Sequence, residues 1–100
     1  MNTFNKYQFL VDLKIDIISG IKSGNIHDIQ EYIINEIDNA CIYYSNCFDI
    51  CKELNATDFN AYDFECDTIM DLAYACLYQF VFSELDTNEL EEFLNECENA

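Results

Sequence analysis

Proline is absent from this 100-residue chain, and glycine occurs only as Gly20 and Gly24. Proline and glycine are the strongest local breakers of regular structure, so very little in the sequence interrupts a helix. Apolar residues recur at intervals of three and four, which places them on one face of an α-helix. The sequence therefore predicts an all-α fold, a compact bundle of four or five helices in one acidic domain spanning residues 1–100.

Capping residues and apolar spacing predict the first two helices. We expect the first helix to begin after Thr3 as its N-cap and to end near Gly20. Asn25 should cap the second helix, which either continues to Leu54 or breaks between Asn39 and Tyr43. The expected apolar stripe of the first helix is Tyr7, Leu10, Val11, Ile17, Ile18 and Ile21, with Asp12 and Asp16 facing solvent.

The second half of the chain predicts a loop followed by two helices. Residues 55–67 show no helical period, and a third helix then spans about 67–85. That helix has two apolar stripes, and a helix that is apolar on most sides is either central or shared with a partner. Asp86 lies three residues before Glu89 and predicts the cap of a last helix over residues 89–97.

Charge is the second strong feature of the chain. Twenty acidic residues face four lysines, and the net charge of −16 is uneven: residues 1–52 carry −3 and residues 53–100 carry −13. Such a surface excludes direct binding to nucleic-acid phosphates, which requires basic patches. A composition that is 51% hydrophobic also excludes a disordered acidic chain. No apolar run could span a membrane and no signal peptide is recognisable, so we expect a cytoplasmic protein that binds no membrane.

The acidic residues recur at helical neighbour spacing, where like charges destabilise a helix by roughly 0.2–0.5 kcal/mol per pair. Few lysines are present to offset this repulsion. We therefore infer that the negative field itself has a function, since such a field steers basic partners. Carboxylates on one helix face lie about 5–6 Å apart, and a DNA strand carries one charge per about 3.4 Å. Two staggered rows of carboxylates on rigid helices can therefore approximate the phosphate pattern. This suggests a DNA mimic that occupies the DNA site of an enzyme. Two alternatives stay open: a helical adaptor or anti-CRISPR-type inhibitor that binds through an apolar stripe, and a halophilic or purely structural helical protein.

The reactive residues predict no chemistry of their own. The six cysteines contain no C-x-x-C pair, so we expect buried thiols rather than a zinc site. His27 is the only histidine and is expected at the surface. We therefore predict that the chain is not an enzyme and needs no metal or cofactor.

Several short segments resemble the Ocr-like family, the phage DNA mimics that defeat host restriction. The resemblance covers about residues 26–55 and 76–96, and its motifs are Asp28-Ile29, Ile33, Asp38-Asn39-Ala40, Tyr43-Tyr44, Phe48, Leu77-Tyr78-Gln79 and Glu91-Glu92-Phe93-Leu94-Asn95-Glu96. It implies an elongated all-α homodimer that mimics bent duplex DNA. The implied partner is a host DNA-binding defence enzyme, with the type I restriction–modification complex favoured, in the host cytoplasm. Unlike that family, this chain has no proline between Ala40 and Tyr43.

The resemblance and the charge pattern together define the candidate residues. The resemblance implies a DNA-mimicking surface of Asp28, Glu31, Glu36, Asp38, Asp49, Glu53, Glu91, Glu92 and Glu96, to which the acidic pattern adds Asp63, Asp67 and Asp71. It also implies Phe48 at the dimer contact, and the second apolar stripe of the third helix adds Met70, Tyr74 and Tyr78.

Overall fold

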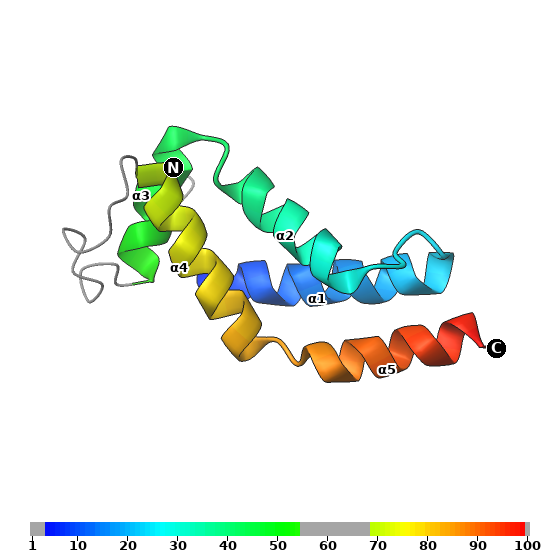
Figure 1. The fold of residues 1–100 in the computed structure, drawn as a ribbon. Helices are drawn as coiled ribbons and strands as arrows, with labels where there is room; N and C mark the ends of the chain where they lie inside the picture. The colour runs from blue at the N-terminus through cyan, green and yellow to red at the C-terminus, as the bar shows by residue number, and fades with distance from the viewer. Residues whose placement is uncertain (1–3, 55–68, 100) are drawn as a thin grey trace.

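A computed structural model describes residues 4–54 and 69–99 of the chain (Figure 1). All regular structure in these two ranges is helical, which confirms the all-α prediction. The five helices are α1 (Lys6–Ser23), α2 (Ile29–Ala40), α3 (Tyr44–Glu53), α4 (Ile69–Glu84) and α5 (Thr87–Glu98). The principal-axis extents are 49 × 29 × 19 Å. Thr3 and the expected loop over 55–67 lie outside the described residues.

Helix α1 is shifted toward the C-terminus relative to its prediction. Its N-cap is Asn5, whose side chain accepts a hydrogen bond from the Gln8 amide at 2.9 Å. Its C-cap is Gly24, in the left-handed region at φ 80°, so the expected end near Gly20 is wrong by about one turn. Gly20 instead lies within the helix, and its carbonyl accepts hydrogen bonds from the chain that folds back after the cap.

The buried face of α1 matches the expected stripe only in part. Ile17 and Ile21 are buried as predicted, and Leu10 and Ile18 are half-buried. Tyr7 and Val11 are 66% and 52% exposed, and Leu13, which the expected stripe did not include, is buried instead. Leu13 and Val11 both have helical spacing from their neighbours, so periodicity alone does not tell which of them faces the core.

A break separates α2 from α3, as one of the two alternatives for residues 26–54 anticipated. Helix α2 begins after Asp28 rather than Asn25, and the Asp28 carboxylate accepts a hydrogen bond from the Glu31 amide at 3.0 Å. At the break, the buried Cys47 thiol donates to the carbonyl of Cys41 at 3.3 Å. This thiol bonds a backbone acceptor at the end of α2, where a helix leaves carbonyls without intrahelical partners. The break contains no proline, and this thiol supplies a partner for one backbone carbonyl at it.

Helix α4 contributes to the single hydrophobic core that all five helices share. It packs against α3 and α2, while α5 packs against α1 and α2. The core side chains that α4 contributes are Leu72, Ala73, Cys76, Leu77 and Val81. Asp86 caps α5 as predicted, accepting a hydrogen bond from the Glu89 amide at 3.1 Å, although α5 begins two residues earlier than expected. Within the described ranges, no helix is long and apolar enough to cross a membrane.

Candidate protein-binding surfaces

The carboxylates predicted as the DNA-mimicking surface are spread over α2, α3, α4 and α5. We call the ten described ones the acidic surface; Asp63 and Asp67 lie outside the described residues. Asp28, Glu31, Asp38, Asp71, Glu91, Glu92 and Glu96 are exposed, and Glu36, Asp49 and Glu53 are half-buried. None of the ten is buried, so each can contribute to the field outside the molecule.

The structure brings three subsets of these carboxylates together. Asp28 and Glu31 line one hollow at the start of α2. Asp38 and Asp71 line a second, about 440 Å³ in volume, where the end of α2 meets the start of α4. Glu92 and Glu96 line a third, between α1 and α5, together with Glu89, Lys14 and Lys22. Glu89 was not among the residues predicted for this surface, although its spacing from Glu92 and Glu96 places all three on one helix face.

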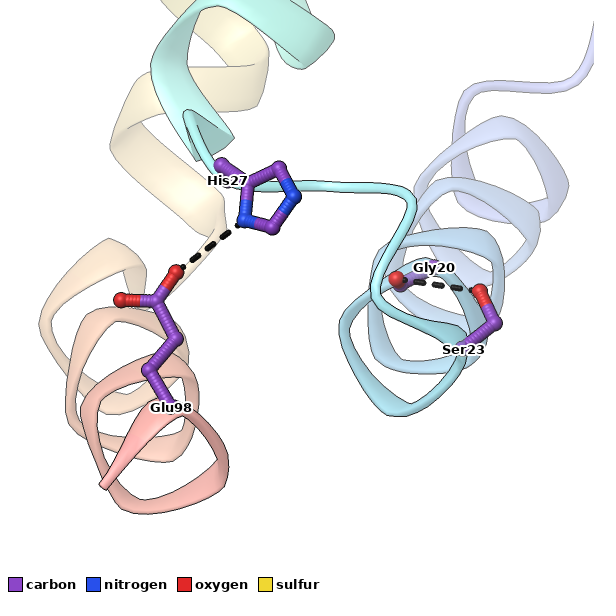
Figure 2. Close-up of polar contacts among 4 residues, drawn as sticks. All are labelled: Gly20, Ser23, His27 and Glu98. Carbon is purple, nitrogen blue, oxygen red and sulfur yellow. Dashed lines mark hydrogen bonds and ion pairs between the residues drawn. The ribbon is translucent and has the colours of Figure 1, made fainter. Parts of the chain in front are cut away.

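Very little protein charge neutralises this surface. An ion pair joins His27 Nδ1 to Glu98 Oε1 at 3.2 Å, and it links the start of α2 to the end of α5 (Figure 2). Its side chains are 72% and 47% exposed, so water screens the interaction and it contributes little to stability. The exposure of His27 agrees with its predicted place at the surface.

Two tyrosines respond to the negative field. Burial raises the pKa of Tyr32, and the nearby carboxylates of Glu36 and Asp16 raise it further. Burial likewise raises the pKa of Tyr74, with an added contribution from Asp38. The electrostatic part of each shift has the sign expected near uncompensated negative charge.

A second candidate surface is apolar and lies on α3 and α4. We call Phe48, Met70, Tyr74 and Tyr78 the α3–α4 patch. Phe48 is 43% exposed, Met70 is 39% exposed and Tyr78 is 37% exposed, while Tyr74 is half-buried. The rings of Tyr74 and Tyr78 stack with their centroids 6.1 Å apart.

Two exposed apolar residues near this patch were not predicted to belong to a binding surface. Ile42 and Tyr43, in the connection between α2 and α3, are 57% and 66% exposed. Ile42 lines the same hollow as Met70 and Tyr74. Residues in a connection show no periodicity, so the signals were their apolar character between two acidic helices and, for Tyr43, its place in the Tyr43-Tyr44 motif.

The cysteines belong to the core rather than to a site. Cys41, Cys47, Cys51 and Cys76 are buried, which confirms the expected role for these four. Burial raises the pKa of Cys41 to about 12, and the neighbouring Cys47 and Asp38 add to the effect. A thiol with so high a pKa stays protonated at neutral pH and is a poor nucleophile. Among the described residues, no group of histidine, cysteine and acidic side chains is arranged to hold a metal ion.

No protein-family model, no curated protein and no solved structure matches this chain. The molecule offers two candidate binding surfaces, the acidic surface and the α3–α4 patch. Both present groups that suit a protein partner: one offers charge, and the other offers apolar area.

Proposed function

We propose that this protein is a DNA mimic that occupies the DNA-binding groove of a host defence enzyme, with the type I restriction–modification complex as the favoured target. The observation that carries the proposal is its charge density. A net charge of −16 along a longest extent of 49 Å is one charge per about 3 Å. A single DNA strand carries one charge per 3.4 Å. One copy therefore presents charge at about the linear density of one DNA strand, which is about half the density of the duplex at one charge per 1.7 Å.

The fold supports this proposal by holding the charges on rigid elements. Carboxylates on α2 and α5 sit on helices whose first turns are fixed by the caps Asp28 and Asp86. Fixed charges lose less entropy on binding than charges on a flexible chain. A basic groove would be attracted at long range and then meet a preformed row of acceptors.

We further propose that two copies pair through the α3–α4 patch, which would double the charge of the particle to −32. The patch offers stacked aromatic rings and exposed apolar side chains on a helix that carries few acidic residues. Tyr74→Asp or Tyr78→Asp should abolish this pairing and lower the mass of the assembly, since each places a charge in the contact. An unchanged mass in light scattering would reject this assignment of the interface.

A competition titration tests the mimic. Fluorescent duplex DNA is bound to a purified type I methyltransferase, and the protein is added at two salt concentrations. We expect displacement near stoichiometry that weakens with salt, because exposed charges are screened. No displacement at low salt would contradict the type I target. Binding that ignores both salt and DNA would favour the helical adaptor instead.

A matched pair of variants identifies the acidic surface as the contact. The amide variant carries Glu31→Gln, Asp38→Asn, Asp49→Asn and Glu91→Gln. The control carries Glu31→Asp, Asp38→Glu, Asp49→Glu and Glu91→Asp, and therefore keeps every charge. We expect the amide variant to lose about tenfold in affinity, at roughly 0.4 kcal/mol for each exposed contact, and the control to lose much less. Equal losses would mean that shape rather than charge makes the contact.

A further inference from the structure

Helices α1 and α5 lie side by side and run in the same direction along the molecule (Figure 1). Between them is a groove of about 310 Å³. Its lining consists of Lys14, Ile18 and Lys22 from α1, and Glu89, Leu90, Glu92, Phe93 and Glu96 from α5. We call this surface the α1–α5 face.

The α1–α5 face has a basic edge and an acidic edge. Lys14 and Lys22 lie on α1, which carries three of the four lysines of the chain. Glu89, Glu92 and Glu96 lie on α5. In the described part of the chain, neither groove lysine forms an ion pair, so both ammonium groups remain available to a partner.

Exposed apolar side chains adjoin the basic edge. Ile15 borders a hollow that shares Ile18 and Lys22 with the groove, and it is 59% exposed. Val11, one turn earlier on α1, is 52% exposed. The core of the protein does not use these side chains, and burying them against a partner would contribute about 25 cal/mol for each Å² removed from water.

We propose that a second copy of this chain docks on the α1–α5 face, about a twofold axis parallel to the two helices. Such an axis places α1 of each copy against α5 of the other, because it exchanges the two edges of the face. Lys14 and Lys22 of each copy then face the three glutamates of the other copy's α5. The basic edge of one copy therefore meets the acidic edge of its partner on both sides of the axis.

Charge also favours self-association through the α1–α5 face over self-association through other parts of the surface. Two lysines and three glutamates give the face a net charge of −1, whereas the whole chain carries −16. Two copies that approach through their acidic helices would meet strong mutual repulsion. This contact would cover Glu92 and Glu96 of the acidic surface, so in the assembly the other eight described carboxylates would face the target enzyme. The contact is separate from the α3–α4 patch.

Charge exchange tests the proposal in the full chain. The variant K14E/K22E makes both edges acidic, and we expect the dissociation constant of self-association to rise about tenfold or more. The variant K14E/K22E/E89K/E96K restores opposite edges, with their positions exchanged, and should restore the assembly. Sedimentation equilibrium gives the mass, which should fall by half in K14E/K22E; one chain has a mass of 11.7 kDa.

A composition-matched control separates position from net charge. The variant K14E/K22E/E31K/E84K has the same composition and net charge as the exchanged variant, but its new lysines lie on exposed positions of α2 and α4. It should stay dissociated. Circular dichroism confirms that each variant remains helical.

Three results would overturn the proposal. A wild-type chain that stays monomeric at its highest soluble concentration has no such contact. A K14E/K22E variant with the wild-type mass shows that this face is not used. Equal recovery in the exchanged variant and in its control shows that net charge alone governs assembly.

Discussion

Gly20 offers a test of how closely the chain packs where it folds back on α1. A Cβ added at this position would lie 2.5 Å from Cγ1 of Ile26, well inside van der Waals contact. The backbone of Ile26 cannot retreat easily, because the Gly20 carbonyl accepts hydrogen bonds from the amides of Asn25 and Ile26 at 2.8 and 3.1 Å. Ser23 Oγ also donates to this carbonyl at 3.1 Å (Figure 2).

Two opposing effects decide the outcome of Gly20→Ala. Alanine in place of glycine within a helix gains about 1 kcal/mol. Overpacking a buried contact costs about 1–3 kcal/mol, and Ile26 is only 6% exposed. We therefore expect Gly20→Ala to lower the free energy of unfolding by about 1 kcal/mol, measured by urea denaturation with far-UV circular dichroism.

A double-mutant cycle with Ile26→Ala isolates the contact. Truncation at Ile26 removes Cγ1 and Cδ1, so Gly20→Ala should become stabilising by about 1 kcal/mol in that background, a coupling of about 2 kcal/mol. Gly24→Ala is the control: no atom lies within 4 Å of its added Cβ, but its φ of +80° makes alanine unfavourable by about 1 kcal/mol. That cost should be similar in both backgrounds. If Gly20→Ala stabilises the wild-type chain, the reasoning about the close approach is refuted.

Two further stability predictions follow from the caps and the buried thiols. Asp86→Ala removes the acceptor for the Glu89 amide and should cost about 0.5–2 kcal/mol in urea denaturation, whereas the exposed Asn88→Ala in the same helix should cost much less; equal costs would show that the cap contributes nothing. Cys41 has its pKa raised to about 12 from an ordinary value of 9, so the unfolded chain loses this proton first as pH rises. The free energy of unfolding should therefore fall between pH 9 and pH 12, by up to about 1.4 kcal/mol per pH unit. Cys41→Ala should remove this part of the pH dependence, and an unchanged profile would contradict it.

The fold class could be predicted because few residues oppose helix and many support it. On α2, Ile29, Ile33 and Ile37 recur every fourth residue, and all three are buried. Asp86 was identified as a cap because its carboxylate lies three residues before Glu89, whose amide in the first turn has no carbonyl partner within the helix. Such features depend only on near neighbours in the chain, so the sequence is sufficient to predict them.

The errors at α1 concern which of two local candidates the tertiary structure uses. Gly20 and Gly24 could each end α1, and the choice depends on Ile26, which fills the space beside Gly20. Likewise, Leu13 is buried while Val11 is exposed, and this choice depends on how α2 and α5 pack against α1.

The candidate surfaces were predictable as a composition but not as an arrangement. Every described member of the acidic surface is exposed or half-buried, as charged residues usually are. The hollow at Asp28 and Glu31 is local to the start of α2, but the other two hollows depend on how distant helices meet, such as Asp38 on α2 beside Asp71 on α4. The two lysines beside the glutamates of α5 depend on the same kind of contact.

The sparse internal neutralisation of the carboxylates has a consequence for the solution around the protein. Exposed carboxylates that outnumber the basic side chains retain a surrounding layer of mobile cations, as the phosphates of DNA do, and a basic groove would release those cations as it binds. The affinity would then decrease linearly with salt on logarithmic axes, and its slope would report how many ions are released. Compared with the ten described carboxylates of the acidic surface, that number would indicate how much of the surface a partner covers.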